Sequence, residues 1–163
     1  MTTKHMQITR VFGILLFTLV VRPAFGQGEI FIPISDGGVQ EIDCESGSVY
    51  VFTDDNSGST DAQDPYSSQN YSITFCPSTP GDAIVVDFIL VDLETNFNPN
   101  NNDVLEVFNG MPGSPSLGNI TSTQTDAQAT IFNDTGCLTF DWTVNNGAGD
   151  NHVGWIGIIT CDA

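Results

Sequence analysis

The chain has 163 residues, of which 20 are Asp or Glu and only three are Lys or Arg, so its formal net charge is −17 at pH 7. All three basic residues, Lys4, Arg10 and Arg22, precede residue 27, and all the acidic residues follow it. Because nucleic acids and anionic membranes are bound largely through Lys and Arg, this distribution excludes both as direct partners of residues 27–163.

Residues 1–26 have the features of a secretory signal peptide. Lys4 and Arg10 precede an apolar run at 11–21, and the small residues Ala24 and Gly26 precede an expected cleavage before Gln27. The apolar run is shorter than the about 20 residues that a membrane-spanning helix needs. We therefore expect a secreted or cell-surface protein with a single domain at residues 27–163.

After residue 26, apolar residues come in short β-branched or aromatic runs separated by Gly, Asn, Asp, Ser and Pro. This pattern is typical of strands joined by turns. Strict alternation over 138–144 indicates an antiparallel strand with one buried face. The run 84–91 is apolar on both faces and predicts a central strand that is covered on both sides. The predicted strands are residues 29–33, 39–42, 48–53, 71–75, 83–93, 103–108, 129–133, 137–143 and 153–161.

About nine short strands without crossover helices predict an all-β fold, either an antiparallel two-sheet β-sandwich or a jelly roll. Two polar stretches, 54–64 and 96–102, are expected to form loops at an end of the sheets. Trp142 and Trp155 lie in alternating strands, so we expect both in the core rather than on a sugar-binding surface.

Four cysteines, Cys44, Cys76, Cys137 and Cys161, follow the signal segment, and in an oxidising compartment they are expected to form two disulfides. Three pairings are possible, of which the sequential one, Cys44 with Cys76 and Cys137 with Cys161, is the simplest. The chain has no Cys-x-x-Cys spacing, so a zinc–thiolate site is not expected.

The sequence carries no recognisable catalytic motif. His152 is the only His after residue 26 and is not accompanied by a Gly-x-Ser-x-Gly nucleophile motif, so it is interpreted as an exposed turn residue. The stretch Asp54-Asp55-Asn56-Ser57-Gly58 superficially resembles a calcium loop. It lacks the closing Glu and the flanking helices of an EF-hand, and is interpreted as a solvated acidic loop.

Several segments between residues 66 and 161 together resemble the CUB family, particularly the two-disulfide CUB-like domains of bacterial surface proteins. The clearest is VDFILVDLETNFNPNNNDVLEVFNG, similar to the family's central strand ending in Leu-Glu, a loop, and then Asp-x-Leu-Glu-Val. DPYSSQNYSITFCP, the Pro-x-Leu-Gly turn in PSLGN, GCLTFDWTVNN and VGWIGIITC follow in the order of the family. The resemblance implies a two-sheet sandwich whose end loops bind proteins or glycans outside the cell.

The resemblance also implies a calcium site, because many family members hold the ion at one end of the sandwich. The matching positions are Glu94, Asp103 and Asn145, the last replacing a family Asp, with a Tyr that is either Tyr66 or Tyr71. Carboxylate and carbonyl oxygens suit calcium, and the lost charge at Asn145 is expected to weaken the site. The plain alternative is that an acidic chain places carboxylates at strand ends without a ligand.

The predicted function is a non-catalytic extracellular or cell-surface module for adhesion or ligand binding, organised partly by calcium. Its expected partner is an extracellular protein or a glycan, together with further domains if the chain is the first module of a longer protein. The first alternative is a carbohydrate-binding module appended to a secreted enzyme. The second alternative is an enzyme in its own right.

Overall fold

The computed structural model describes residues 28–54, 67–95, 101–121, 129–131, 136–145 and 152–162. The signal segment lies outside these ranges, so the signal peptide and its cleavage site stay predictions. Within the described ranges, no helix is long and apolar enough to cross a membrane.

The described residues form ten short strands and one 3-10 turn. Every predicted strand coincides with an observed one to within a few residues, although the end of the predicted strand 129–133 lies outside the described part. The elements are β1 (Glu29–Pro33), η1 (Ile34–Asp36), β2 (Gly38–Ile42), β3 (Val49–Thr53), β4 (Tyr71–Pro77), β5 (Ala83–Asp92), β6 (Val104–Asn109), β7 (Ser116–Ile120), β8 (Ala129–Ile131), β9 (Leu138–Thr143) and β10 (Gly154–Asp162).

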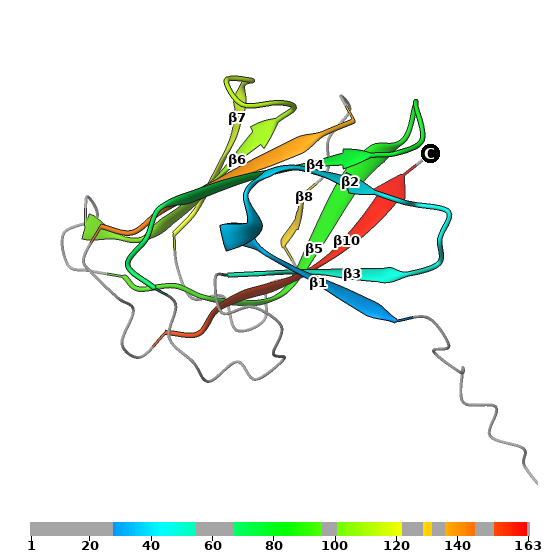
Figure 1. The fold of residues 1–163 in the computed structure, drawn as a ribbon. Helices are drawn as coiled ribbons and strands as arrows, with labels where there is room; N and C mark the ends of the chain where they lie inside the picture. Colours follow the sequence, from blue (N-terminus) through cyan, green and yellow to red (C-terminus); the bar gives the residue numbers. More distant parts are fainter. Residues whose placement is uncertain are drawn as a thin grey trace, which may run out of the picture.

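The strands form two five-stranded sheets, sheet A in the order β1-β3-β10-β5-β8 and sheet B in the order β2-β4-β9-β6-β7. The two sheets are the layers of a sandwich (Figure 1). The predicted all-β sandwich is confirmed, but the sheets are mixed rather than wholly antiparallel, because β1 and β3, and also β2 and β4, are parallel. From β1 to β4 the chain passes to the other sheet after each strand and reverses its direction each time. The strands β1 and β3 therefore run in the same direction in sheet A, and β2 and β4 do so in sheet B.

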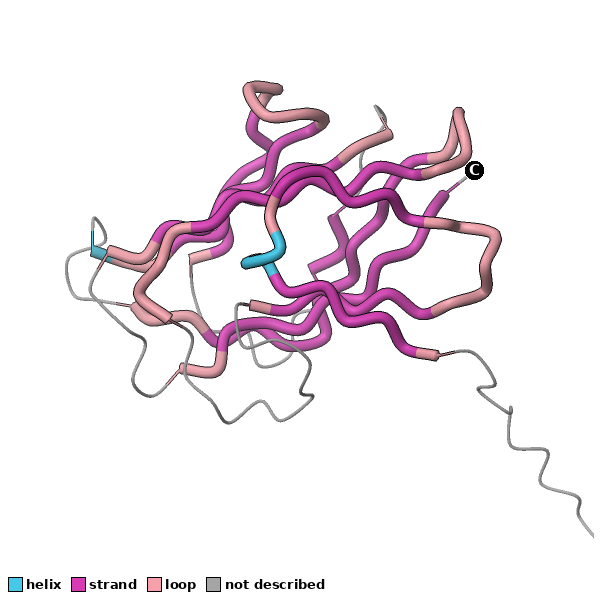
Figure 2. The backbone as a smooth tube through the Cα atoms, in the orientation of Figure 1, coloured by secondary structure: helices cyan, strands magenta, loops and turns pink. Residues whose placement is uncertain are grey.

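The first of these crossings is made by η1, the short 3-10 turn between β1 and β2 (Figure 2). Ile34 in this turn is fully buried, and its N–H donates to the backbone oxygen of Asp54 at 3.3 Å. Gly37 and Gly38 follow with φ of 59° and 65°, which glycine adopts without steric cost. The glycine pair therefore lets the chain reverse into sheet B.

The prediction that β5 is covered on both faces is only partly confirmed, because on the outer face Val85 is 8% exposed but Ile89 is 56% exposed. A β-bulge also interrupts the strand. Ile156 of β10 pairs with Leu90, but the next residue, Gly157, pairs with Phe88, so Ile89 is an extra residue. The side chains alternate up to Phe88, which is buried, and the alternation resumes at Val91, which is also buried. Ile89 faces outward by ordinary alternation from Phe88, and it is 56% exposed. The bulge lets Val91, rather than Leu90, face the core. The sequence of this run looks apolar on both faces partly because even-numbered residues face the core before the bulge and an odd-numbered residue, Val91, faces it after the bulge.

Strand β7 is a second correction, because its sequence was interpreted as a turn. Val107 of β6 pairs with Gly118 and Phe108 pairs with Ser116, so Leu117 is the extra residue of another bulge. Only Ile120 of β7 is buried. A short edge strand with one buried side chain and a bulge has no detectable alternation, which explains why the sequence did not indicate it.

The core between the sheets is built around aromatic side chains. The ring of Phe52 lies 5.0 Å from those of Phe75 and Phe140, measured between centroids. Trp142 and Trp155 meet edge to face at 4.9 Å, and each is only 1% exposed. The prediction that both tryptophans are core residues is therefore confirmed.

The four cysteines form two disulfides, but the sequential pairing is wrong. Cys44 pairs with Cys161 and Cys76 pairs with Cys137. The cause is the topology, since β4 lies beside β9, and the end of β2 lies across the sandwich from the end of β10. The linked cysteines are 117 and 61 residues apart, so on the chain-entropy model each bond stabilises the fold by about 4 to 5 kcal/mol.

Candidate cation site at one end of the sandwich

The fold brings three of the predicted metal ligands to one end of the sandwich. Glu94 follows β5, Asp103 precedes β6 and Asn145 follows β9. Strands β6 and β9 are antiparallel neighbours with Val104 opposite Thr143, so the start of one lies beside the end of the other. The sheet register therefore places these residues together.

Hydrogen bonds hold the three residues in position. The N–H of Asn145 donates to Oδ1 of Asp103 at 2.8 Å, and the N–H of Asp103 donates to the backbone oxygen of Glu94 at 3.3 Å. The side-chain amide of Asn145 donates to the backbone oxygen of Asn102 at 2.6 Å. Since the NH₂ group of Asn145 faces Asn102, its amide oxygen is the atom left to face a cation.

The burial of the three residues differs in a way that suits a cation site. Asp103 is fully buried, Glu94 is partly buried and Asn145 is exposed. A buried carboxylate needs hydrogen bonds or a counter-ion, and the Asn145 N–H supplies one hydrogen bond. Two carboxylates and an amide oxygen form a donor set that fits a hard cation such as calcium, which takes six to eight oxygens. The remaining oxygens would have to come from other groups or water.

Of the two tyrosines that were predicted as a possible fourth ligand, the structure describes only one. Tyr66 lies outside the described residues. The alternative, Tyr71, begins β4 opposite Trp142 and packs against the core cluster. In the described part of the chain no three His, Cys, Asp or Glu side chains form a metal-binding group.

Asp54 lies at the same end and departs from its expected role. It was interpreted as part of a solvated loop, but it is only 4% exposed. The inward alternation of Tyr50 and Phe52 along β3 continues to Asp54, which explains its burial. Its carboxylate lies against Gly154, where an added Cβ would overlap it. Residues 55–58 of the same stretch lie outside the described residues.

His152 was interpreted from the sequence as an exposed turn residue, but it is only partly exposed and has a carboxylate partner. Its Nδ1 lies 3.0 Å from Oδ1 of Asp92, and its side chain is 30% exposed. The N–H of Val153 donates to the other oxygen of Asp92 at 3.2 Å. Asp92 therefore holds the segment before β10 to the end of β5, and the histidine contacts a carboxylate rather than a Ser or Cys nucleophile. No sequence signal marked Asp92 for this role.

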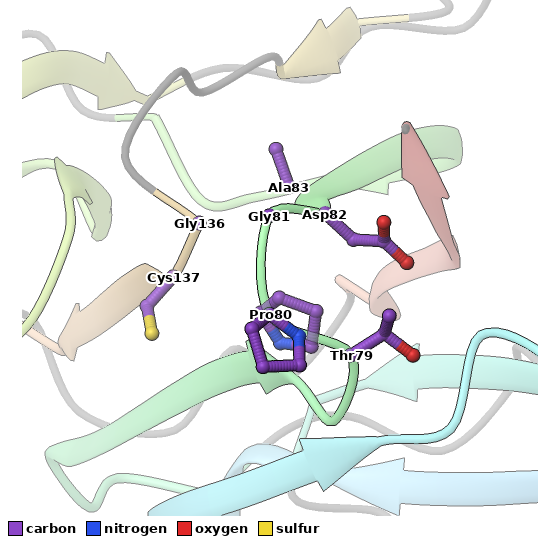
Figure 3. Close-up of a pocket in the computed structure, with 8 residues that line it drawn as sticks. Thr79, Pro80, Gly81, Asp82, Ala83, Gly136 and Cys137 are labelled. Atoms are coloured by element: carbon purple, nitrogen blue, oxygen red, sulfur yellow. The ribbon is translucent and has the colours of Figure 1, made fainter.

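Two surface cavities lie at the opposite end of the sandwich. The larger, of about 330 Å³, lies between the β4–β5 turn and the start of β9 (Figure 3). The smaller, of about 170 Å³, adjoins Cys44 and Cys161. Neither cavity contains Glu94, Asp103 or Asn145, so neither forms part of the candidate cation site.

Comparison with known proteins relates the chain to others through its fold. No family model matches the chain, and no curated protein matches it. Among solved structures, the CUB1-EGF-CUB2 domain of human MASP-1/3 superimposes with a TM-score of 0.55 at 19% identity, covering 77% of this chain. The fold is CUB-like. The chain spans 41% of the length of that human structure.

Two further CUB-like matches have different contexts. The MASP-1 CUB2 domain bound to Ca²⁺ matches with a TM-score of 0.53 at 17% identity, covering 76% of this chain and 97% of that one. The full extracellular region of zebrafish Gpr126/Adgrg6 matches with a TM-score of 0.55 at 15% identity, covering 78% of this chain and 15% of that one. At these identities the matches establish the fold alone.

Proposed function

We propose that the chain is a non-catalytic, extracellular binding module that contacts its ligand through the loops at the Glu94–Asp103–Asn145 end and is organised there by calcium. The observation that carries this proposal is the hydrogen-bonded union of Asp103 and Asn145 beside Glu94. The CUB-like fold and the calcium-bound MASP-1 CUB2 domain support it. The ligand is an extracellular protein or a glycan.

Secretion is part of the same proposal. The signal-like segment at residues 1–26 and two disulfides among the later residues suit an oxidising compartment. The extracellular origin of the zebrafish structure is consistent with this location. Because the chain is acidic and has no Lys or Arg after residue 22, it also suits a partner with a positively charged surface.

Calcium titration of the mature protein tests the proposal. We expect calcium to release or absorb heat in calorimetry and to raise the melting temperature, and a chelator to reverse the rise. Asp103→Asn keeps an oxygen for the Asn145 N–H but removes a charge, and should weaken calcium binding by at least about ten-fold.

Asp162→Asn is the matched control, because it removes the same charge from an exposed residue at the other end of the sandwich. It should leave calcium affinity nearly unchanged. The absence of both heat and a thermal shift in the unmodified protein would refute the calcium component.

The alternative function, a carbohydrate-binding module, is less well supported by the structure. Trp142 and Trp155 are both 1% exposed, so neither offers a surface on which a sugar ring could stack. A glycan array separates the two candidates. Strong glycan binding that survives Asp103→Asn and chelation would favour the carbohydrate module over the calcium-organised one. Turnover of peptide or glycoside substrates would instead favour an enzyme.

A further inference from the structure

We propose that the Cys76–Cys137 disulfide is a thiol–disulfide exchange site for small thiols, while Cys44–Cys161 is the structural bond of the sandwich. The two disulfides differ in whether they join strands of one sheet or strands of the two sheets. Cys76 lies on β4 and Cys137 directly precedes β9, and these are neighbouring strands of one sheet. Cys44 follows β2 of sheet B and Cys161 lies on β10 of sheet A. Only the second bond links the two layers.

The strands joined by Cys76–Cys137 are already held together without it. Five residue pairs form the antiparallel β4–β9 ladder, from Tyr71 opposite Trp142 to Phe75 opposite Leu138. The hydroxyls of Thr74 and Thr139 also hydrogen-bond at 2.8 Å, and both side chains are buried. Opening the disulfide therefore leaves β4 and β9 paired.

Strand β2 has less support of its own. Among the described residues it pairs with β4 alone, at the edge of sheet B. Cys44 and Cys161 both pack against the core cluster. Opening this bond removes the covalent tie between the layers at that end and loosens packing in the core, so we expect the fold to resist it.

Cys76 faces the outside of sheet B, because Ile73 and Phe75 of the same strand point into the core. Its Sγ lies 3.9 Å from the sulfur of Met111, whose side chain is 48% exposed. Next to Cys76 across the sheet, Cys137 lines the cavity of about 330 Å³ (Figure 3). This cavity is about twice the volume of the one beside Cys44 and Cys161, which is about 170 Å³.

The exchange proceeds in two balanced steps. A thiolate that enters the cavity attacks Sγ of Cys137, the bond to Cys76 breaks, and Cys76 leaves as a thiolate that takes up a proton. A second thiolate then attacks the mixed disulfide at the sulfur of the bound thiol and releases Cys137. Two small thiols are oxidised to one disulfide, and the protein disulfide gains two electrons.

Partial reduction of the native, full-length mature protein tests this assignment. The protein is exposed to dithiothreitol without denaturant, free thiols are alkylated at intervals, and labelled cysteines are located by peptide mass spectrometry. We expect Cys76 and Cys137 to be labelled at least about ten-fold faster than Cys44 and Cys161, with the circular dichroism spectrum retained. Labelling of Cys44 and Cys161 first, or of all four only as the protein unfolds, would overturn the proposal.

Paired substitutions give an independent readout. Both double variants lose a similar loop-closure contribution, but Cys44→Ala/Cys161→Ala also loses packing against the core cluster and the link between the layers. It should therefore melt at a lower temperature than Cys76→Ala/Cys137→Ala or fail to fold, whereas the latter should keep a cooperative melting transition. Equal losses in the two variants would contradict the division of roles, even if alkylation were selective.

The charge of Asp82, which also lines the cavity, tests the route of entry. Reduction by glutathione, a negatively charged thiol, should be accelerated about two-fold at low salt by Asp82→Asn, while reduction by the neutral dithiothreitol should not change. Asp36→Asn, at an exposed residue of η1, is the control. Identical effects of the two substitutions on glutathione would show that the cavity is not the route.

Discussion

Gly154 shows how a single backbone position shapes the acidic end of the sandwich. It starts β10 with φ of 76°, and the space that its Cβ would occupy is filled by the carboxylate of Asp54. A residue with a side chain would meet both an unfavourable backbone conformation and a buried neighbour. The glycine thus allows Asp54 to be buried where β3 and β10 meet.

Replacing this glycine should be costly. Gly154→Ala is expected to lower the free energy of unfolding by about 2 to 4 kcal/mol, since the positive φ and the contact with Asp54 both oppose the new methyl group. Urea denaturation measures the loss. Gly28→Ala, at a position where an added Cβ meets nothing within 4 Å, is the control.

A second variant separates the two causes. Gly154→Ala combined with Asp54→Ala removes the overlap but keeps the backbone strain, so it should recover part of the lost stability. A Gly154→Ala protein as stable as the Gly28→Ala control would show that neither the backbone conformation nor Asp54 restricts this position.

At the scale of the elements, the bulge in β5 changes which alternate residues of the strand face the core. Phe88 and Val91 both face the core, while Ile89 and Leu90 lie between them. Removing one of the two intervening residues restores ordinary alternation without turning any core residue outward. The bulge is therefore separable from the core packing.

Deletion of Ile89 tests this account. We expect the deletion to lower the free energy of unfolding by less than about 1.5 kcal/mol, because every buried side chain of β5 keeps its side of the sheet. Deletion of Val86, in the regular part of the strand, should prevent folding since it reverses one half of β5. Chemical denaturation of both proteins provides the comparison, and similar damage from both deletions would rule out this change of alternation.

The strands themselves were predictable because β-branched and aromatic runs bounded by turn residues are a local signal. What the sequence could not indicate was the direction of β1 to β4, which depends on crossings between the sheets. The bulge at Leu117 and the exposed face of β7 removed the alternation that would have marked that strand. The cysteine pairing failed for the same topological reason, since it follows strand neighbours and not chain order.

Like the fold, the candidate cation site was predicted only in part. Glu94, Asp103 and Asn145 came from the family resemblance, and the β6–β9 register brings the last two together. Asp54 and Asp92 carried no such signal, because a carboxylate in an acidic chain looks alike whether it is buried, bonded to a neighbour or solvated. Their roles depend on the side of the strand and on partners that are distant in sequence.

At the scale of the whole molecule, charge opposes the fold. Residues 27–163 contain 20 carboxylates and no Lys or Arg, so the compact state gathers like charges without basic side chains to balance them. The unfolded chain spreads the same charges over a larger volume. Screening by salt should therefore favour the folded state.

We expect the melting temperature to rise with sodium chloride between about 20 and 300 mM, over which the Debye length falls from about 20 Å to about 6 Å. A gain of about 1 kcal/mol corresponds to roughly 3 to 4 °C for a domain of this size. Scanning calorimetry at constant pH in the presence of a chelator measures the effect. Sucrose at matched osmolality is the control, and an equal rise in sucrose would argue against screening.

The nested arrangement of the two disulfides, Cys76–Cys137 within Cys44–Cys161, has a consequence for biogenesis. If the chain is exported from its N-terminus as proposed, Cys44 and Cys76 reach the oxidising compartment well before Cys137 and Cys161. A bond between those two is off-pathway and has to be reshuffled. On that proposal, correct oxidation would be a late event that awaits the final strand, and an isomerase acting on the nearly complete chain would shorten the delay.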